Sequence, residues 1–188
     1  AMGSEQAQAF HDILHVYEGL ADRYGLWDAA NIMMEWCSDD GFIDFRAWLI
    51  AQGKEVYLSA LKDPDTLADI EPYGNCCFES LSYVGDDAYR QLTGQNAYEN
   101  ADPAARKKWK AILGADIVYR EDIRFPRPRR ALPAAYPRLC AKYGGAERFD
   151  TDDIGWNIGS KDVRSLLERG KEYDLEKKLS QKKGGEGR

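Results

Sequence analysis

The sequence has few of the residues from which common catalytic and metal sites are built. It contains two histidines and four cysteines, and no two cysteines have the C-x-x-C spacing of zinc sites. A P-loop and a G-x-G-x-x-G loop are both missing, so nucleotide binding lacks its usual phosphate loop. No G-x-S-x-G elbow occurs either. We therefore expect free, mostly buried thiols in a reducing compartment, and no cofactor.

Long apolar runs are missing too. No stretch reaches the length of a membrane span and no secretory leader is recognisable, which predicts a cytoplasmic protein without a membrane partner. What is present is a large apolar fraction, 44% of 188 residues, which predicts a packed interior. Five tryptophans and eleven tyrosines add to it, and aromatic side chains dominate both cores and interfaces.

The charge is distributed unevenly along the chain. Residues 1–100 hold 5 basic and 18 acidic side chains, whereas residues 101–188 hold 21 basic and 14 acidic ones. An acidic body followed by a basic tail implies either pairing within the chain or a partner that is recognised by charge.

Apolar residues recur at helical spacing through most of the chain, which predicts an all-α fold. One helix is expected over residues 6–24, with Gly25 as its stop, and a second over 27–36 that is apolar on nearly all sides. A helix over 76–93 should end at Gly94 and pack through an apolar stripe, namely Phe78, Leu81, Ala88, Tyr89 and Leu92. Asp-Pro pairs predict further helix starts at Pro64 and Pro103.

These helices predict a compact multi-helix single domain over residues 6–144. Prolines at 126, 128, 133 and 137 exclude a long regular helix in that region, although a short one is expected over 137–143. Residues 145–188 are expected to form a basic extension with one helix over 162–179 and a disordered end.

The sequence CSDDG contains the most prominent candidate site. Asp39 and Asp40 are adjacent carboxylates, which could hold a hard cation or supply an acid and a base, with Arg46 beside them. The structural alternative is that Ser38 and the two aspartates cap a helix and that Arg46 turns back to pair with one of them. We favour the structural alternative, because acids and serine are common at helix starts.

His11 and His15 stand four residues apart on one helix face, a spacing at which two imidazoles can share a metal ion. The same stripe continues through Glu18 and Asp22, opposite the apolar stripe of this helix. We therefore interpret it as a solvated face, with metal binding as the less favoured alternative.

The segment RFPRPRR joins four arginines to rigid prolines: Arg124, Arg127, Arg129 and Arg130. It could bind phosphates of a nucleic acid, or it could lie across the acidic body of the same chain. Among the aromatic residues, Trp27, Trp36 and Trp48 are most simply core residues, and one or two of them could line a groove for a partner.

The stretch from Leu26 to Asp69 resembles the bacterial domain-of-unknown-function family 4240. The shared patterns are LW-x-AA, CSDD-x-F-x-x-FR-x-WLI, G-x-x-x-[YF] and DPD-[ST]-LAD, and weaker similarity extends the resemblance roughly from Phe10 to Gly144. The chain has Cys140 where the family usually has tryptophan. The resemblance implies the fold and supplies no reaction.

The function expected from these features is that of a non-enzymatic protein-binding module of the immunity or regulatory type. Its support is the acidic body, the many aromatic residues and the missing catalytic signature. One alternative is a metal-dependent or acid–base enzyme that uses Asp39, Asp40 and Arg46. A second alternative is nucleic-acid contact through the basic C-terminal segment.

Overall fold

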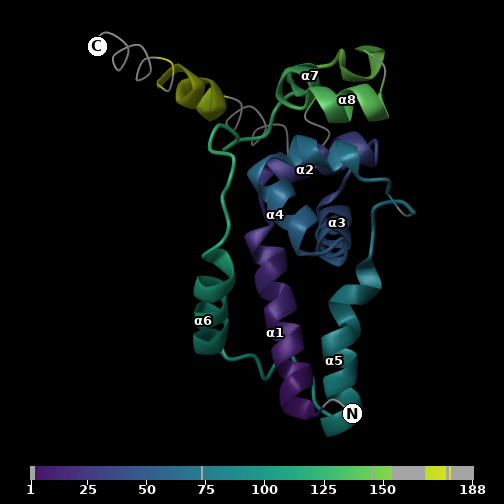
Figure 1. Ribbon diagram of the computed structural model, residues 1–188, viewed down its shortest axis with the longest axis vertical. Helices are drawn as coiled ribbons and strands as arrows, with labels where there is room; N and C mark the ends of the chain where they lie inside the picture. Colours follow the sequence, from purple (N-terminus) through teal and green to yellow (C-terminus); the bar gives the residue numbers. More distant parts are fainter. Residues whose placement is uncertain (1–2, 73, 145, 154–167, 177, 179–188) are drawn as a thin grey trace.

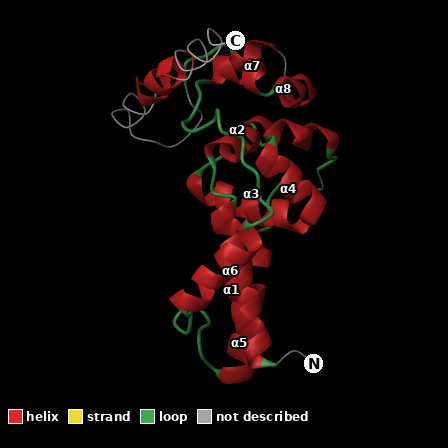
Figure 2. Ribbon diagram, turned by 60° about the vertical axis from the view of Figure 1, so that its left-hand side comes forward, coloured by secondary structure: helices red, strands yellow, loops and turns green. Residues whose placement is uncertain are grey.

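The computed structural model describes residues 3–72, 74–144, 146–153, 168–176 and 178. Within these ranges the chain forms helices and loops and contains no strand (Figure 2). The predicted all-α, multi-helix fold is therefore confirmed.

The helices follow one another closely along the chain. In order they are α1 (Ser4–Leu20), α2 (Tyr24–Met33), α3 (Asp39–Ala51), α4 (Lys54–Lys62), the 3₁₀ helix η1 (Pro64–Asp69), α5 (Glu79–Thr93), α6 (Pro103–Gly114), η2 (Arg129–Ala131), α7 (Leu132–Ala135), α8 (Pro137–Tyr143) and η3 (Ala146–Phe149). The helix expected over 137–143 is confirmed, and one turn of helix also forms around Pro133, which occupies its first turn.

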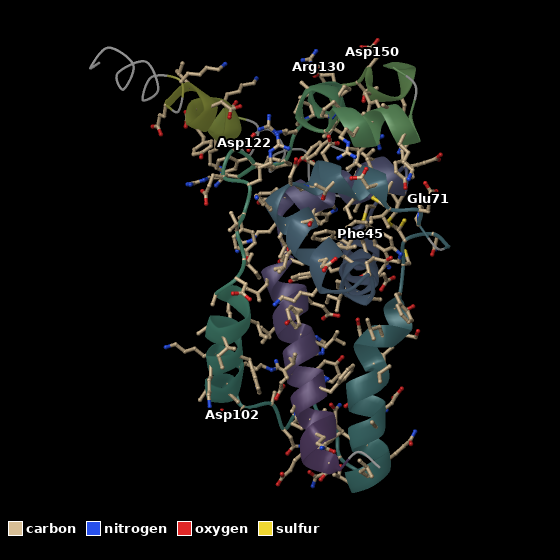
Figure 3. All side chains as sticks on the ribbon, in the orientation of Figure 1. Phe45, Glu71, Asp102, Asp122, Arg130 and Asp150 are labelled. Carbon is tan, nitrogen blue, oxygen red and sulfur yellow. The ribbon has the colours of Figure 1, made fainter. Side chains whose placement is uncertain are left out.

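Two groups of helices make up the molecule. Helices α1, α5 and α6 lie side by side as a long arm, with α1 in the middle (Figure 1). Helices α2, α3, α4, α7 and α8 form a cluster at one end of that arm. Figure 3 shows Phe45 inside this cluster and Asp102 near the opposite end of the molecule.

The main core lies in the cluster. Its centre is a run of aromatic rings: Trp27 stacks on Phe42 at 4.7 Å between ring centroids, Phe42 lies 6.3 Å from Phe45, and Phe45 lies 5.4 Å from Trp48. Helix α2 crosses this core and is buried along almost its whole length, as its apolar composition predicts. Two of its buried residues, Asp28 and Asn31, are polar and need partners inside the protein.

Two predicted helix ends have different outcomes. Gly94 ends α5 in the left-handed conformation with φ of 73°, as expected. Gly25 does not end α1, which stops at Leu20; it lies in the first turn of α2 instead. A Cβ atom at position 25 would lie 3.2 Å from Cγ of Pro64, so this glycine allows α2 to approach η1 closely.

The prediction for the packing face of α5 was wrong. The residues of this helix that are buried are Ser82, Gly85 and Asp86, whereas Phe78 and Leu92 from the predicted stripe are exposed. Gly85 explains the difference, because a Cβ atom there would lie only 2.7 Å from Cα of His11. The absence of a side chain brings α5 into close contact with the polar face of α1.

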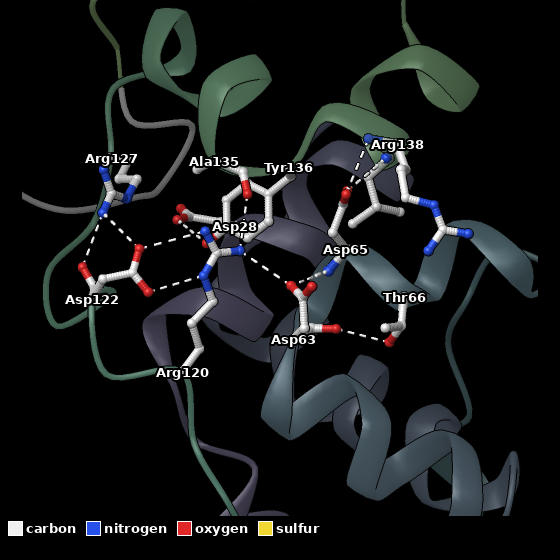
Figure 4. A network of polar contacts seen from close by, with 11 residues as sticks. Asp28, Asp63, Asp65, Thr66, Arg120, Asp122, Arg127, Ala135, Tyr136 and Arg138 are labelled. Carbon is white, nitrogen blue, oxygen red and sulfur yellow. Dashed lines mark hydrogen bonds and ion pairs between the residues drawn. The ribbon is translucent and has the colours of Figure 1, made fainter.

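A polar network joins α7 and α8 to the other helices of the cluster (Figure 4). Asp65 of η1 accepts hydrogen bonds from the backbone N–H groups of Arg138 and Leu139 at 3.1 and 2.9 Å, so it caps α8 from a distant part of the sequence. Arg120 binds Asp63 at 3.1 Å and the carbonyl of Ala135 at 2.9 Å. The DPD sequence thus fixes η1 and also holds the C-terminal helices.

Parts of the C-terminal segment complete the structure. Phe149 of η3 is buried in the main core, and residues 168–176 are helical, within the helix expected over 162–179. Tyr173 donates a hydrogen bond to the carbonyl of Glu121 at 3.0 Å. The disordered end expected for the last residues lies outside the described residues.

Candidate functional site: an acidic face on α3 and α5

The CSDDG corner is a helix start. The hydroxyl of Ser38 accepts a hydrogen bond from the N–H of Gly41 at 3.0 Å, and Asp39 and Asp40 occupy the first turn of α3. Their carboxylates there interact favourably with the positive end of the helix dipole. The capping prediction is confirmed.

The pairing predicted for Arg46 was wrong. Its guanidinium donates to the carbonyl of Glu18 at 3.0 Å and lies 3.9 Å from the carboxylate of Asp22. Arg46 therefore satisfies one carbonyl group near the end of α1 and does not pair with Asp39 or Asp40. The two aspartates and Arg46 do not come together as a cleft, and among the described residues no group of three histidine, cysteine or acidic side chains has a metal-binding arrangement.

The histidine stripe is not a solvated face, so that interpretation was wrong. His11 is fully buried and Glu18 nearly so, because α1 turns this stripe toward α5 and α6. The two imidazole rings meet edge to face at 4.3 Å, and Arg106 of α6 contacts the Nε2 atom of His11 at 3.3 Å. Burial, followed by the neighbouring His15, lowers the pKa of His11 to about 4.

Glu18 lies at the centre of this polar layer. Ser82 donates to one of its oxygens at 2.7 Å, and Nδ1 of His15 lies 2.7 Å from the other. Burial raises the pKa of Glu18, but the hydrogen bonds from His15 and Ser82 and the charges of His15 and Arg46 together bring it below its ordinary value. The acid stands between the serine and the histidine, so Ser82 contacts a carboxylate of lowered pKa, a weak proton acceptor, and not an imidazole. The layer is a structural contact between helices.

The four arginines of the proline-rich segment are paired with groups of the same chain. Arg124 binds Glu121 at 2.8 Å, Arg127 donates to the carbonyl of Asp122 at 2.9 Å, and Arg129 and Arg130 bind Asp153 and Asp152 at 2.8 and 2.5 Å. Of the two alternatives for this segment, the contacts favour internal pairing, because Arg127 and Arg129 are mostly buried and bind groups of the same chain.

The three candidate tryptophans occupy different environments. Trp48 is buried in the main core, and Trp27 is half-buried against Phe42. Trp36 is 56% exposed and is the one of the three whose ring is available to a partner. The cysteines are free thiols, and burial raises the pKa of Cys37 and Cys140 to about 12, so neither is a thiolate at neutral pH.

A surface on α3 and the start of α5 combines acids with exposed apolar groups. We define the acidic face as the residues Asp40, Ile43, Asp44, Phe78, Glu79 and Tyr83. The first three share one side of α3 by their i, i+3 and i+4 spacing. The N–H of Phe78 donates to the carbonyl of Asp44 at 3.1 Å, which joins the beginning of α5 to α3. The aromatic and aliphatic side chains of this face are 41 to 46% exposed.

The acids of this face repel one another. Partial burial raises the pKa of Asp44, and the neighbouring carboxylates of Glu79 and Asp40 raise it further. Within the described parts of the chain, Asp40 and Asp44 form no ion pair. Glu79 accepts a hydrogen bond from the hydroxyl of Tyr83 at 3.0 Å. The face therefore carries negative charge that no cation of the described chain neutralises.

Sequence reasoning identified Asp40 for a different role and missed the rest of this face. Phe78 was expected in the apolar stripe of its helix, and Ile43 and Asp44 were not assigned a role from the sequence. One signal was available: positions 40, 43 and 44 are spaced to lie together on the side of α3 opposite Phe42, Phe45 and Trp48.

The comparisons with known proteins give a family and no function. A family model described as "Protein of unknown function (DUF4240)" matches residues 1–91. The match covers α1 to α4, η1 and most of α5, and it ends well before Gly144, to which the sequence similarity was expected to extend. Searches of the curated proteins and of the solved structures found no match to this chain.

Proposed function

Residues 1–91 of this chain belong to the DUF4240 family of proteins of unknown function, and for this member we propose a non-enzymatic role as a protein-binding module. The acidic face is the proposed binding surface, and all of its residues lie within the matched region. The partner is a protein with a basic surface that also offers apolar groups.

The observation that carries the proposal is the electrostatic strain on Asp44. Like charges placed side by side without a cation cost stability; partial burial raises the pKa of Asp44, and repulsion by Glu79 and Asp40 raises it further. A basic partner would relieve this repulsion on binding, and complementary charge would also speed the encounter. The exposed rings of Phe78 and Tyr83 would supply the apolar contact area that binding needs at the centre of an interface.

The chemistry of the other candidate sites supports this choice over catalysis. Asp39 and Asp40 lie in the first turn of α3, and Arg46 binds the carbonyl of Glu18 near the end of α1. In the buried polar layer the acid separates the serine from the histidine, which is not the arrangement of a nucleophile and its base. Two of the four arginines of the proline-rich segment, Arg127 and Arg129, are mostly buried in contacts within the chain, so they are less available to a nucleic acid than the sequence suggests.

A cytoplasmic location is part of the proposal. The four cysteines are free, which is typical of reducing compartments. Among the described residues no helix has the length and apolar content needed to cross a lipid bilayer.

The test compares two variants that lose the same number of negative charges. The face variant carries Asp40→Asn, Asp44→Asn and Glu79→Gln. The control variant carries Glu5→Gln, Glu55→Gln and Glu99→Gln, which are exposed acids at other places. Each protein is immobilised and incubated with extract of the source cells, and the bound proteins are quantified by mass spectrometry at low and moderate salt.

The proposal predicts one defined basic protein that binds the wild type and the control variant and is lost from the face variant by at least tenfold. Asp40 and Glu79 each lie in the first turn of a helix, so neutralising each costs about 0.3–1 kcal/mol, which the relief of repulsion within the face offsets in part. The face variant should therefore remain folded under the conditions of the assay. Equal binding of that protein by the face variant and the wild type would contradict the proposal.

A further inference from the structure

A cavity of about 330 Å³ opens between the arm and the cluster, and none of its lining residues belongs to the acidic face. Its walls come from four helices and include Tyr17 of α1, Ile50 of α3, Lys54 and Tyr57 of α4, Leu113 of α6 and Asp116 just after α6. The volume is at the lower end of the range of about 300–1,000 Å³ that is typical of small-molecule sites.

The interior of the cavity is apolar and aromatic. Tyr17 and Tyr57 meet edge to face with ring centroids 5.4 Å apart. The hydroxyl of Tyr57 donates to the carbonyl of Tyr17 at 2.7 Å, so this polar group is already satisfied. The tyrosine rings, Ile50 and Leu113 therefore present carbon surface to an occupant, and aromatic rings favour a second ring at their edges or faces.

The mouth of the cavity carries one charge of each sign. The ammonium group of Lys54 lies 3.4 Å from the carboxylate of Asp116, and both side chains are about 70% exposed, at 74% and 69%. An ion pair this exposed contributes little to stability, so breaking it to bind the charged groups of a ligand costs little free energy. Together they match a molecule that carries a carboxylate and an ammonium group side by side.

The wall formed by α6 is held loosely enough to admit a ligand. No residue of α6 is buried, and its main packing partner is α1. Arg106 anchors its first half through Asp12 at 2.8 Å, and beyond its end Tyr119 donates to the carbonyl of Leu20 at 3.0 Å. Between these anchors, Leu113 faces the cavity.

From this juxtaposition we propose that the cavity binds a free aromatic amino acid. The aromatic ring of the ligand lies in the cavity, with the pair of tyrosines on one side and Leu113 on the other. The α-carboxylate of the ligand binds Lys54, and its α-ammonium group binds Asp116. The proposal concerns a second surface of the protein and does not depend on the proposed role of the acidic face.

Isothermal titration calorimetry with four probes tests it: L-phenylalanine, 3-phenylpropionate without the ammonium group, phenethylamine without the carboxylate, and L-alanine without the ring. We expect L-phenylalanine to bind with a millimolar or smaller dissociation constant, and the other three to bind at least tenfold more weakly.

Variants at the mouth separate the two charges. Lys54→Met should weaken L-phenylalanine at least tenfold and leave phenethylamine unchanged, whereas Asp116→Asn should weaken L-phenylalanine and leave 3-phenylpropionate unchanged. Lys107→Met, at an exposed position of α6 outside the cavity, is the matched control and should bind like the wild type. Absence of L-phenylalanine binding, equal affinity for all four probes, or an unchanged affinity in Lys54→Met would overturn the proposal.

Discussion

Replacing Gly85 with alanine tests whether the contact between α1 and α5 is as close as the structure has it. The new Cβ atom would lie 2.7 Å from both Cα and Cβ of His11. It would also lie 2.8 Å from the backbone N of His11. Two of these three atoms belong to the backbone and the third, Cβ, is bonded directly to it, so none can rotate away. The helices must separate instead, and the hydrogen bond of 2.7 Å between Ser82 and Glu18 would lengthen with them.

The expected loss of stability follows from three contributions. Overpacking costs about 1–3 kcal/mol, and a weakened hydrogen bond to a buried charged group costs about 1–3 kcal/mol. The higher helix propensity of alanine returns about 1 kcal/mol. We expect Gly85→Ala to lower the free energy of unfolding by about 2–3 kcal/mol, measured by urea denaturation with far-UV circular dichroism.

Gly19→Ala is the matched control. Gly19 lies in α1, on the exposed side, and a Cβ atom there would have no neighbour within 4 Å. Its substitution should raise stability by about 0.5 kcal/mol through helix propensity alone. If Gly85→Ala unfolds at the same urea concentration as Gly19→Ala, the close packing of α1 on α5 is refuted.

Three further outcomes are expected. His11→Gln should flatten the fall in stability between pH 6.5 and 4, because the folded protein holds the pKa of His11 at about 4, below its ordinary 6.5, and acid therefore favours unfolding. Asp28→Asn should remove an opposite dependence: burial raises the pKa of Asp28 from 3.8 to about 7, so stability falls as pH rises through that window. For both variants the free energy of unfolding is measured by urea denaturation at several pH values that span the two windows. If its dependence on pH is the same in a variant as in the wild type, the pKa assigned to that residue is contradicted. Asp44→Asn should raise stability at pH 7 by about 0.5 kcal/mol because it removes like-charge repulsion, and a fall in the denaturation midpoint would count against the strained face.

The fold class and most helix starts could be predicted because they depend on local patterns. Ser38, the Asp-Pro pairs and Gly94 act within a few residues of their own helix, and sequence spacing records them directly. The core of α3 was predictable for the same reason, since Phe42, Phe45 and Trp48 repeat at helical spacing.

What could not be predicted depends on distant partners. The histidine stripe of α1 has the composition of a solvated face, but Gly85 and Ser82 of α5 cover it. These residues are about 70 positions away in the sequence, so no local pattern around His11 indicates the contact. The pairing of Arg46 was misassigned because Asp39 and Asp40 are near it in the sequence, whereas its actual partner is the carbonyl of Glu18 in α1. Polar residues that satisfy each other between helices have the same composition as a solvated face.

Hydrogen–deuterium exchange on the chain with and without its captured partner locates the binding surface. Binding should protect the backbone amides around residues 40–44 and 78–83, on α3 and the start of α5, and leave residues 122–130 unchanged. Protection confined to the arginine-rich segment, with no change on α3 and α5, would contradict the proposed binding surface.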